Sequence, residues 1–199
     1  MVNIAVMVSG GGTNLQALID ACNHNEINGK IQLVVSSKES AYGLVRAEKA
    51  NIKAIYTKDE AVILKELKEA NIDLIVLAGY LAIVGDELIN EYKNRIINIH
   101  PSLIPAFCGP GFYGSHVHKA VFNRGVKVSG ATVHFVSNEV DGGPIILQRS
   151  IDISDCNNPE EIQTKILINI EHKILSEAVK LYCDGLLEIK DNRVIIKGE

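Results

Sequence analysis

Short apolar runs alternate with amphipathic segments along the first half of the chain. Apolar runs of strand length lie at residues 2–8, 31–36 and 73–78. Segments with apolar residues at helical spacing lie near residues 15–22, 41–50 and 60–71. Continuous apolar runs predict strands that are buried on both faces, as in a parallel sheet. The alternation therefore predicts β-α-β units with helices on both faces of the sheet.

The pattern changes after Arg95. Residues 96–100 predict another strand, and residues 129–136 and 144–150 predict two strands joined by a short turn. We expect the last two strands to form an antiparallel hairpin at the edge of the sheet. The predicted fold class is therefore α/β: a Rossmann-like, doubly wound, mostly parallel sheet with a late antiparallel edge hairpin, in a single domain spanning residues 1–199.

A long helix is expected near the C-terminus. Residues 158–161 (Asn-Pro-Glu-Glu) combine a capping side chain, a proline at the first helical position and two acids near the positive helix end. The helix should continue to about Tyr182, and Gly185 should end it. Residues 186–196 then alternate enough to predict a small terminal hairpin.

Composition favours one large core and argues against nucleic-acid binding. The 199 residues are 47% hydrophobic, which is ample material for a buried core. Lys and Arg number 20 against 24 Asp and Glu, so the net charge of −4 lacks the basic excess of a phosphate-tracking nucleic-acid binder. Residues 96–118 form the longest stretch without a charged side chain, but prolines and glycines interrupt it, which excludes a membrane helix.

Nothing in the sequence indicates export or a metal site. The N-terminus enters an apolar strand directly, without a basic region or a cleavage site. No Cys-x-x-Cys pair occurs among the cysteines, which are Cys22, Cys108, Cys156 and Cys183. Free thiols in a reducing cytoplasm are therefore favoured over disulfides or structural zinc. We expect a cytoplasmic protein without a metal.

A glycine-rich turn joins the first predicted strand to the first helix. Residues 9–14 are Ser-Gly-Gly-Gly-Thr-Asn, where exposed backbone N–H groups and the helix dipole favour an anion. No lysine follows to hold a triphosphate, and Leu15 occupies the third glycine position of the dinucleotide fingerprint. A single phosphate is therefore favoured over a dinucleotide and over a tight turn that binds nothing.

Asn98 and His100 lie two residues apart on a predicted strand, so their side chains project from the same face. Pro101 ends the ladder, which puts the pair at the carboxyl end of the strand, where open α/β sheets assemble their sites. An amide donor beside an imidazole suits a reaction that develops negative charge on a carbonyl oxygen. A catalytic pair is favoured over the alternative of a buried structural pair.

Other polar residues give weaker signals. Asp141 begins the turn Asp-Gly-Gly-Pro, where a carboxylate could orient an imidazole. On this motif alone, an ordinary turn aspartate that bonds its own backbone is the favoured interpretation. His116 and His118 point apart on a helix and are interpreted as helix-surface histidines, not metal ligands. No partner is visible in the sequence for His24, His134 or His172.

Five motifs follow one another along the chain. They are Ser9-Gly-Gly-Gly-Thr-Asn14, Leu77-Ala-Gly-Tyr80, Asn98-Ile-His-Pro-Ser-Leu-Ile-Pro105, Val133-His-Phe-Val136 and Asp141-Gly-Gly-Pro144. In this order, over residues 2 to about 185, the chain closely resembles the phosphoribosylglycinamide formyltransferases of the folate-dependent formyltransferase family. The resemblance implies a formyltransferase fold that transfers the formyl group of the cosubstrate 10-formyltetrahydrofolate to the amine of 5'-phosphoribosylglycinamide, in de novo purine (IMP) biosynthesis.

The resemblance also implies roles for individual residues. His100 corresponds to the catalytic proton donor, Asn98 to the second stabiliser of the oxyanion, and Asp141 to the group that orients the histidine. The ribonucleotide site corresponds to Gly12, Thr13, Asn14 and Glu171. The folate site corresponds to Leu81, Ala82, Ile83, Val84, Asn98, Ser137, Asn138, Glu139, Val140 and Asp141. Without the resemblance, Glu171 would be interpreted as a solvated helix residue.

Alternatives stay open beside this interpretation. Methionyl-tRNA formyltransferase and formyltetrahydrofolate deformylase share the Asn, His and Asp, but each carries a further domain for which we expect no room in 199 residues. A non-catalytic phosphate-ligand-binding module of the same fold would not need these three side chains. The expected partners are the two small-molecule substrates, with no nucleic acid and no membrane, in a monomer or homodimer.

Four features depart from the family pattern. Ala82 stands where many relatives have arginine, and residues 56–64 form a short region without the usual arginine. Residues 108–115 include extra glycines, and Ile168 replaces a polar residue on the glycinamide side. None of these features touches Asn98, His100 or Asp141.

Overall fold

The computed structural model describes residues 1–198. The strands are β1 (Val2–Val8), β2 (Gly29–Ser36), β3 (Lys53–Tyr56), β4 (Leu74–Leu77), β5 (Ile96–His100), β6 (Val128–Phe135), β7 (Ile145–Asp152), β8 (Leu187–Lys190) and β9 (Arg193–Ile196). The helices are α1 (Thr13–Asn23), α2 (Tyr42–Lys49), α3 (Glu60–Glu69), α4 (Asp86–Glu91), α5 (Ser115–Arg124), α6 (Pro159–Ile166) and α7 (His172–Cys183). The apolar pattern predicted most of these elements, but it missed β3, an edge strand with no fully buried residue, and the six-residue helix α4.

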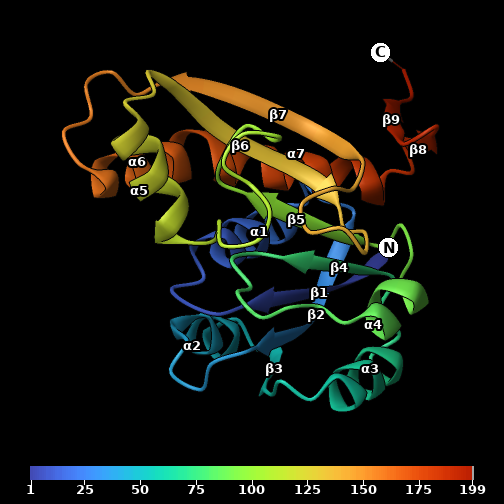
Figure 1. Ribbon diagram of the computed structural model, residues 1–199. Helices are drawn as coiled ribbons and strands as arrows, with labels where there is room; N and C mark the ends of the chain where they lie inside the picture. The colour runs from blue at the N-terminus through green and yellow to red at the C-terminus, as the bar shows by residue number, and fades with distance from the viewer. Residues whose placement is uncertain (199) are drawn as a thin grey trace.

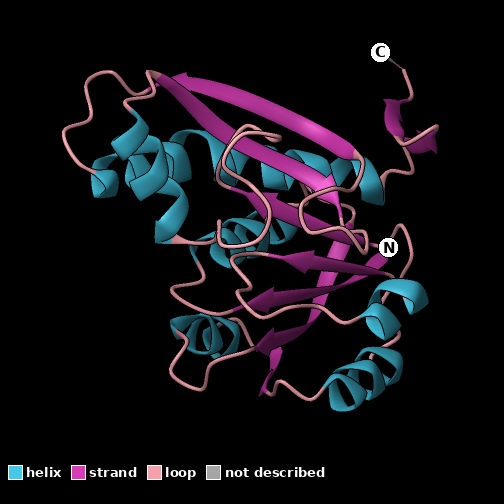
Figure 2. Cartoon of the chain, viewed as in Figure 1, coloured by secondary structure: helices cyan, strands magenta, loops and turns pink. Residues whose placement is uncertain are grey.

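Residues 1–198 form a seven-stranded sheet in the order β3-β2-β1-β4-β5-β6-β7 and a separate β8-β9 pair. Strands β1 to β5 are parallel, whereas β6 pairs antiparallel with β5 and β7 pairs antiparallel with β6. Figure 2 shows β6 and β7 side by side at the upper edge of the sheet, with the β8-β9 pair near the C-terminus. The predicted fold class and its late antiparallel hairpin are confirmed.

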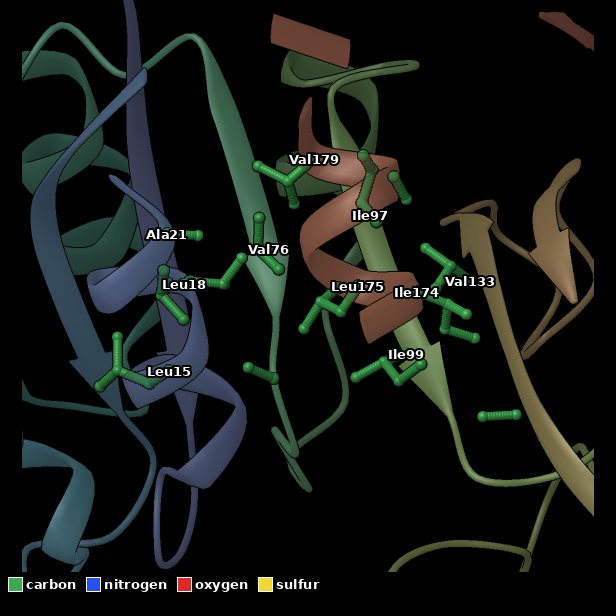
Figure 3. Packing of buried hydrophobic residues seen from close by; sticks show 14 of the residues in the cluster. Leu15, Leu18, Ala21, Val76, Ile97, Ile99, Val133, Ile174, Leu175 and Val179 are labelled. Carbon is green, nitrogen blue, oxygen red and sulfur yellow. The ribbon is translucent and has the colours of Figure 1, made fainter. Parts of the chain in front are cut away.

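The sheet is buried on both faces because successive strand residues point to opposite sides. In β1, Ile4, Val6 and Val8 pack into one hydrophobic cluster, and Ala5 and Met7 pack into the other. The first cluster lies under α1 and α7, and the second under α3 and α4 (Figure 1). Figure 3 shows the first cluster from close by, where side chains of α7 meet those of α1 and of strands β4, β5 and β6.

The strand order reverses at β1, which lies between β2 and β4. Chains that leave neighbouring parallel strands at such a point diverge, and the crevice between them is the usual ligand position in open α/β sheets. The glycine-rich turn follows β1, and Leu81 to Val84 follow β4, while His100 ends β5. The three segments therefore start from the same edge of the sheet.

The predicted C-terminal helix is present but is not regular. Asn158 caps α6 by accepting the backbone N–H of Glu161 at 2.8 Å, as expected. Between α6 and α7, Leu167–Glu171 form a π-helical turn, η1, which the prediction of one continuous helix did not include. A π-turn inserts one extra residue and changes the direction of the side chains around it. Glu171 is the buried residue of this turn.

One prediction about the helices is wrong. His116 is exposed at the start of α5, but His118 is only 2% exposed, so it is not a surface histidine. The two point apart as expected, and the second points inward because Val117, His118 and Val121 form the buried side of α5. None of the helices in residues 1–198 is both long enough and apolar enough to cross a membrane.

Candidate active site

The glycine loop (residues 9–12) joins β1 to α1 and leaves the start of the helix open. Gly12 has a left-handed conformation, with φ of 67°, and a Cβ there would lie 2.7 Å from the Cα of Gly43. Only glycine suits both conditions. Within the described chain, no side chain caps the first N–H groups of α1. These N–H groups and the positive end of the helix dipole are suited to an anion.

A buried pair, Asn14 and Glu171, lies next to this loop. Asn14 Nδ2 donates to Glu171 Oε2 at 2.8 Å, and Glu171 is only 7% exposed. Its interpretation as a solvated helix residue is therefore wrong, because it lies on the same buried face as Ile174 and Leu175 of α7. Burial raises the pKa of Glu171 from 4.5 to about 7, although the bond from Asn14 lowers it. Asn14 Oδ1 is buried without a hydrogen-bond partner among residues 1–198.

The ends of β5 and β6 bring Asn98 and His100 beside His134. Asn98 is paired with His134 across the antiparallel ladder, and His100 lies two residues along on the same face. His100 Nε2 is 2.9 Å from the carbonyl of Phe107, so this nitrogen carries a proton and donates it. His100 Nδ1 faces Asp141 Oδ2 at 3.6 Å. These side chains form a polar cluster of Asn98, His100, His134 and Asp141.

His134 is the member that sequence reasoning missed. Its Nδ1 lies 2.8 Å from the carbonyl of Phe135, which can only accept, so Nδ1 carries the proton. In the neutral ring Nε2 is then an acceptor, and Asn98 Nδ2 donates to it at 3.1 Å. The bond fixes the amide of Asn98 and leaves its second Nδ2–H available. The available signal was the Val-His-Phe motif on the predicted strand 129–136, but the apolar pattern does not show which strand lies beside it or in which register.

Asp141 joins the polar cluster from the turn between β6 and β7. Its φ of 56° is a left-handed conformation that is uncommon outside glycine. Its carboxylate does not bond its own turn: Oδ2 accepts the backbone N–H of Gly109 at 2.9 Å, and Oδ1 lies 3.6 Å from His134 Nε2. Strain of this kind persists where surrounding contacts hold it, which is common at functional sites.

The charges in the polar cluster follow from burial and proximity. Burial lowers the pKa of His100 below its ordinary value, which Asp141 and the Phe107 carbonyl offset only in part. Burial raises the pKa of Asp141, but the nearby imidazoles of His134 and His100 and the hydrogen bond from the Gly109 N–H lower it further, to below its ordinary value. Burial, together with His100, lowers the pKa of His118 to about 4. At neutral pH the cluster therefore combines a neutral His100 with an ionised carboxylate.

The two segments that hold most of the predicted folate-site residues are each joined to another part of the structure by a hydrogen bond. Leu81 N–H donates to Ser9 Oγ at 2.7 Å, which connects the segment after β4 with the glycine loop. Asn138 Nδ2 donates to Asp86 Oδ1 at 2.6 Å, which connects the β6-β7 turn with α4. Ile83 is 90% exposed and Val140 is 55% exposed. Each of the two segments therefore presents an exposed apolar side chain that a ligand could contact.

The remaining predicted folate-site residues vary in exposure. Ala82 and Val84 are half-buried, and Glu139 is exposed. Ser137 Oγ accepts the N–H of Glu139 at 3.3 Å, which closes a small turn before Asp141. Residues 1–198 contain no group of three or more His, Cys, Asp or Glu side chains arranged to hold a metal ion.

Comparison with known proteins gives a consistent assignment. The family profile described as Formyl transferase matches residues 2–179. The phosphoribosylglycinamide formyltransferase of Haemophilus influenzae is 39% identical over 209 aligned positions, which cover 100% of this chain and 95% of that protein. The chain belongs to the phosphoribosylglycinamide formyltransferase family.

Solved structures extend the comparison of this formyltransferase. Glycinamide ribonucleotide transformylase 1 from Symbiobacterium toebii has a TM-score of 0.92 at 39% identity, covering 98% of this chain and 94% of that one. A formyltetrahydrofolate deformylase from Pseudomonas syringae pv. tomato has a TM-score of 0.88 at 26% identity, and the match covers 98% of this chain but 65% of that one. The fold is shared by both activities, and the transformylase is the more similar protein.

Proposed function

We propose that this protein transfers the formyl group of 10-formyltetrahydrofolate to the amine of 5'-phosphoribosylglycinamide, in de novo purine (IMP) biosynthesis. The observation that carries the proposal is the convergence of Asn98, His100 and Asp141 in a chain of this family. Residues 1–199 act as one formyltransferase domain. It works in the cytoplasm on small molecules, without a metal, a nucleic acid or a membrane, as a monomer or homodimer.

The ribonucleotide binds at the glycine loop and the buried pair. Its phosphate accepts hydrogen bonds from the backbone N–H groups of Gly12, Thr13 and Asn14. The uncapped N-terminus of α1 favours a dianion at this position. The unpartnered Asn14 Oδ1 and the carboxyl group of Glu171 bind the polar remainder of the ribonucleotide. A ligand that supplies the missing hydrogen bonds relieves the cost of burying these groups.

The folate binds along the segments after β4 and β6. Backbone groups of Leu81 to Val84 and of Ser137 to Asp141 recognise the pterin, and the exposed apolar side chains of the two segments cover it. Such sites combine apolar walls with a few fixed polar groups, which give orientation. The formyl group then lies against the second Nδ2–H of Asn98.

The chemical step is direct transfer between the two bound molecules. The neutral amine attacks the formyl carbon, a C–N bond forms, and the carbonyl electron pair moves onto the oxygen. The second N–H of Asn98 and the N–H of His100 stabilise this oxyanion, once the Phe107 carbonyl releases His100 Nε2. The oxygen then reforms the carbonyl, the bond to the folate nitrogen breaks, and the amine proton passes through Asp141 or a water to that nitrogen.

An absorbance assay of folate release at neutral pH tests the proposal. Purified protein is mixed with 10-formyltetrahydrofolate together with 5'-phosphoribosylglycinamide, with the riboside that lacks the phosphate, or with no acceptor. We expect rapid release only with the phosphorylated acceptor. Equal release without an acceptor would identify a deformylase, in which water replaces the amine. No folate release in any of the three reactions, with phosphate binding retained, would identify a non-catalytic module.

A further inference from the structure

Helix α2 packs directly against the back of the glycine loop. The N–H of Gly43 donates to the carbonyl of Gly10 at 3.1 Å. Two glycines allow this approach, since a Cβ on Gly12 would lie 2.7 Å from Gly43 Cα, and a Cβ on Gly43 would lie 2.8 Å from Val8. The loop therefore takes its shape from α2 as well as from β1 and α1.

Arg46, one turn further along α2, holds the next peptide of the loop. Its Nε donates to the carbonyl of Gly11 at 2.8 Å, and a terminal nitrogen donates to Gln16 Oε1 on α1 at 3.1 Å. The guanidinium also lies over the ring of Tyr42, 5.2 Å from its centre. Three elements thus fix the position of one side chain.

The charge of Arg46 is not neutralised within the described chain. No carboxylate of residues 1–198 lies within ion-pair distance of its guanidinium, although it is half-buried. A guanidinium keeps its charge whether or not it is paired. The location of Arg46 therefore adds a positive charge behind the loop whose N–H groups face an anion.

Peptide geometry connects these contacts to the anion. In a trans peptide, the C=O and the following N–H point in opposite directions. Because the carbonyls of Gly10 and Gly11 point toward α2, the N–H groups of Gly11 and Gly12 point away from it. They add two donors to those at the open start of α1.

We propose that Arg46 is a positioning residue for the phosphate of the ribonucleotide: it fixes the Gly11 peptide so that Gly12 N–H is presented to the phosphate, and its charge favours the dianion. The inference rests on the proposed function, since it concerns the same phosphate. It adds a residue outside the loop to the recognition of that phosphate. Arg46 acts through the loop and not on the reacting atoms.

Steady-state kinetics test the inference with Arg46→Gln. We expect the KM for the ribonucleotide to rise about tenfold, the effect of one charge-assisted hydrogen bond, with kcat and the KM for folate unchanged. Arg46→Lys should recover part of the loss, because one N–H can still reach Gly11 O but cannot also hold Gln16. Lys49→Gln is the control, since Lys49 lies on the same helix and near the same Tyr42 ring. A fall in kcat with an unchanged ribonucleotide KM would overturn the proposal.

Direct titration separates this inference from the proposed reaction. Amide NMR signals of Gly11 and Gly12 are followed in ¹⁵N-labelled protein as inorganic phosphate is added. They should shift in the wild type and in Lys49→Gln, and Arg46→Gln should need about tenfold more phosphate. Equal affinity in all three proteins would overturn the role of Arg46 even if transfer is observed. Weaker phosphate binding in Arg46→Gln alone would support the role of Arg46 even if the transfer assay shows no folate release. Thermal denaturation checks that Arg46→Gln is folded.

Discussion

The polar cluster and the buried pair both place polar side chains in the interior, but they differ in how far the protein satisfies them. In the polar cluster, each histidine donates to a backbone carbonyl, and Asn98 and Asp141 face the remaining ring nitrogens. In the buried pair, one hydrogen bond joins Asn14 to Glu171, and Asn14 Oδ1 has no partner within residues 1–198. The protein therefore bonds most of the polar cluster itself, whereas the buried pair keeps an acceptor without a partner within residues 1–198.

Because of this difference, the two groups of residues should affect different quantities: the polar cluster the rate of the reaction, and the buried pair the affinity for the ribonucleotide. A donor that is already held in place, such as the second N–H of Asn98, lowers the barrier because it needs no rearrangement as charge develops, and His100 has only to exchange the Phe107 carbonyl for the oxyanion. An incompletely bonded buried group lowers the stability of the free protein and strengthens the binding of a ligand that bonds it. Substitutions in the cluster should change kcat, and substitutions in the pair should change ribonucleotide KM and stability.

The largest effect is expected from His100→Ala. Removal of this proposed oxyanion donor should lower kcat by about 10²–10³, with a much smaller change in the KM values. Steady-state kinetics measure this change, and thermal denaturation checks the fold. His116→Ala is the matched control, because His116 is an exposed histidine nearby on α5. A KM effect without a kcat effect would remove His100 from the chemical step.

Asp141→Asn should lower kcat by about 10² and shift the titration of His100. The charge of Asp141 raises the pKa of His100 against the effect of burial. Its removal should therefore move the His100 titration, followed by NMR of the ring protons, to lower pH than in the wild type. Asp152→Asn, at an exposed position at the end of β7, should leave kcat and the His100 titration unchanged. A His100 titration at unchanged pH would show that Asp141 does not act on that imidazole.

Local sequence signals predicted most of the fold and the outline of the candidate site. The glycine loop and the strand end at Asn98 and His100 are encoded within a few neighbouring residues, because glycine, proline and strand periodicity act locally. Their relation to Asp141 came only from the family resemblance, since the turn motif alone favoured an ordinary turn aspartate. A turn motif carries no information on which distant side chain the carboxylate will face.

Non-local geometry explains the remaining errors. His134 reaches Asn98 through the register of two antiparallel strands, which apolar alternation does not set to the residue. Glu171 lies on the same buried face as Ile174 and Leu175 of α7, and the π-turn puts it out of phase with α6, so one regular helix over the whole segment does not place it. His118 lies on the buried side of α5 with Val117 and Val121, and the sequence did not show which side of this helix faces the core. Each error concerns a polar residue on a buried face.

Glu171→Gln should weaken ribonucleotide binding while it stabilises the protein at alkaline pH. The pKa of Glu171 is raised from 4.5 to about 7, so its contribution to stability is complete below pH 4.5 and is lost as pH rises through 7. Glutamine does not ionise and can still accept from Asn14. At pH 8 the variant should be more stable by on the order of 2 kcal/mol, and at pH 4.5 the difference should vanish.

Denaturant unfolding at several pH values measures this difference, and kinetics measure the expected rise in ribonucleotide KM. Glu177→Gln is the control, since Glu177 is an exposed acid on α7 paired with Arg149. A variant less stable than the wild type at every pH would contradict the view that the pair is incompletely satisfied.

The smallest effect is expected from His134, which acts on the reaction through Asn98. His134→Leu removes the acceptor for Asn98 Nδ2, so the amide loses its fixed orientation and kcat should fall roughly tenfold. His134→Gln supplies a side-chain oxygen that can accept the same N–H, and it should retain more of the activity. Steady-state kinetics on the two variants measure the difference. Equal kcat values would mean that the bond to Asn98 does not contribute, and that the cluster is organised by His100 and Asp141 alone.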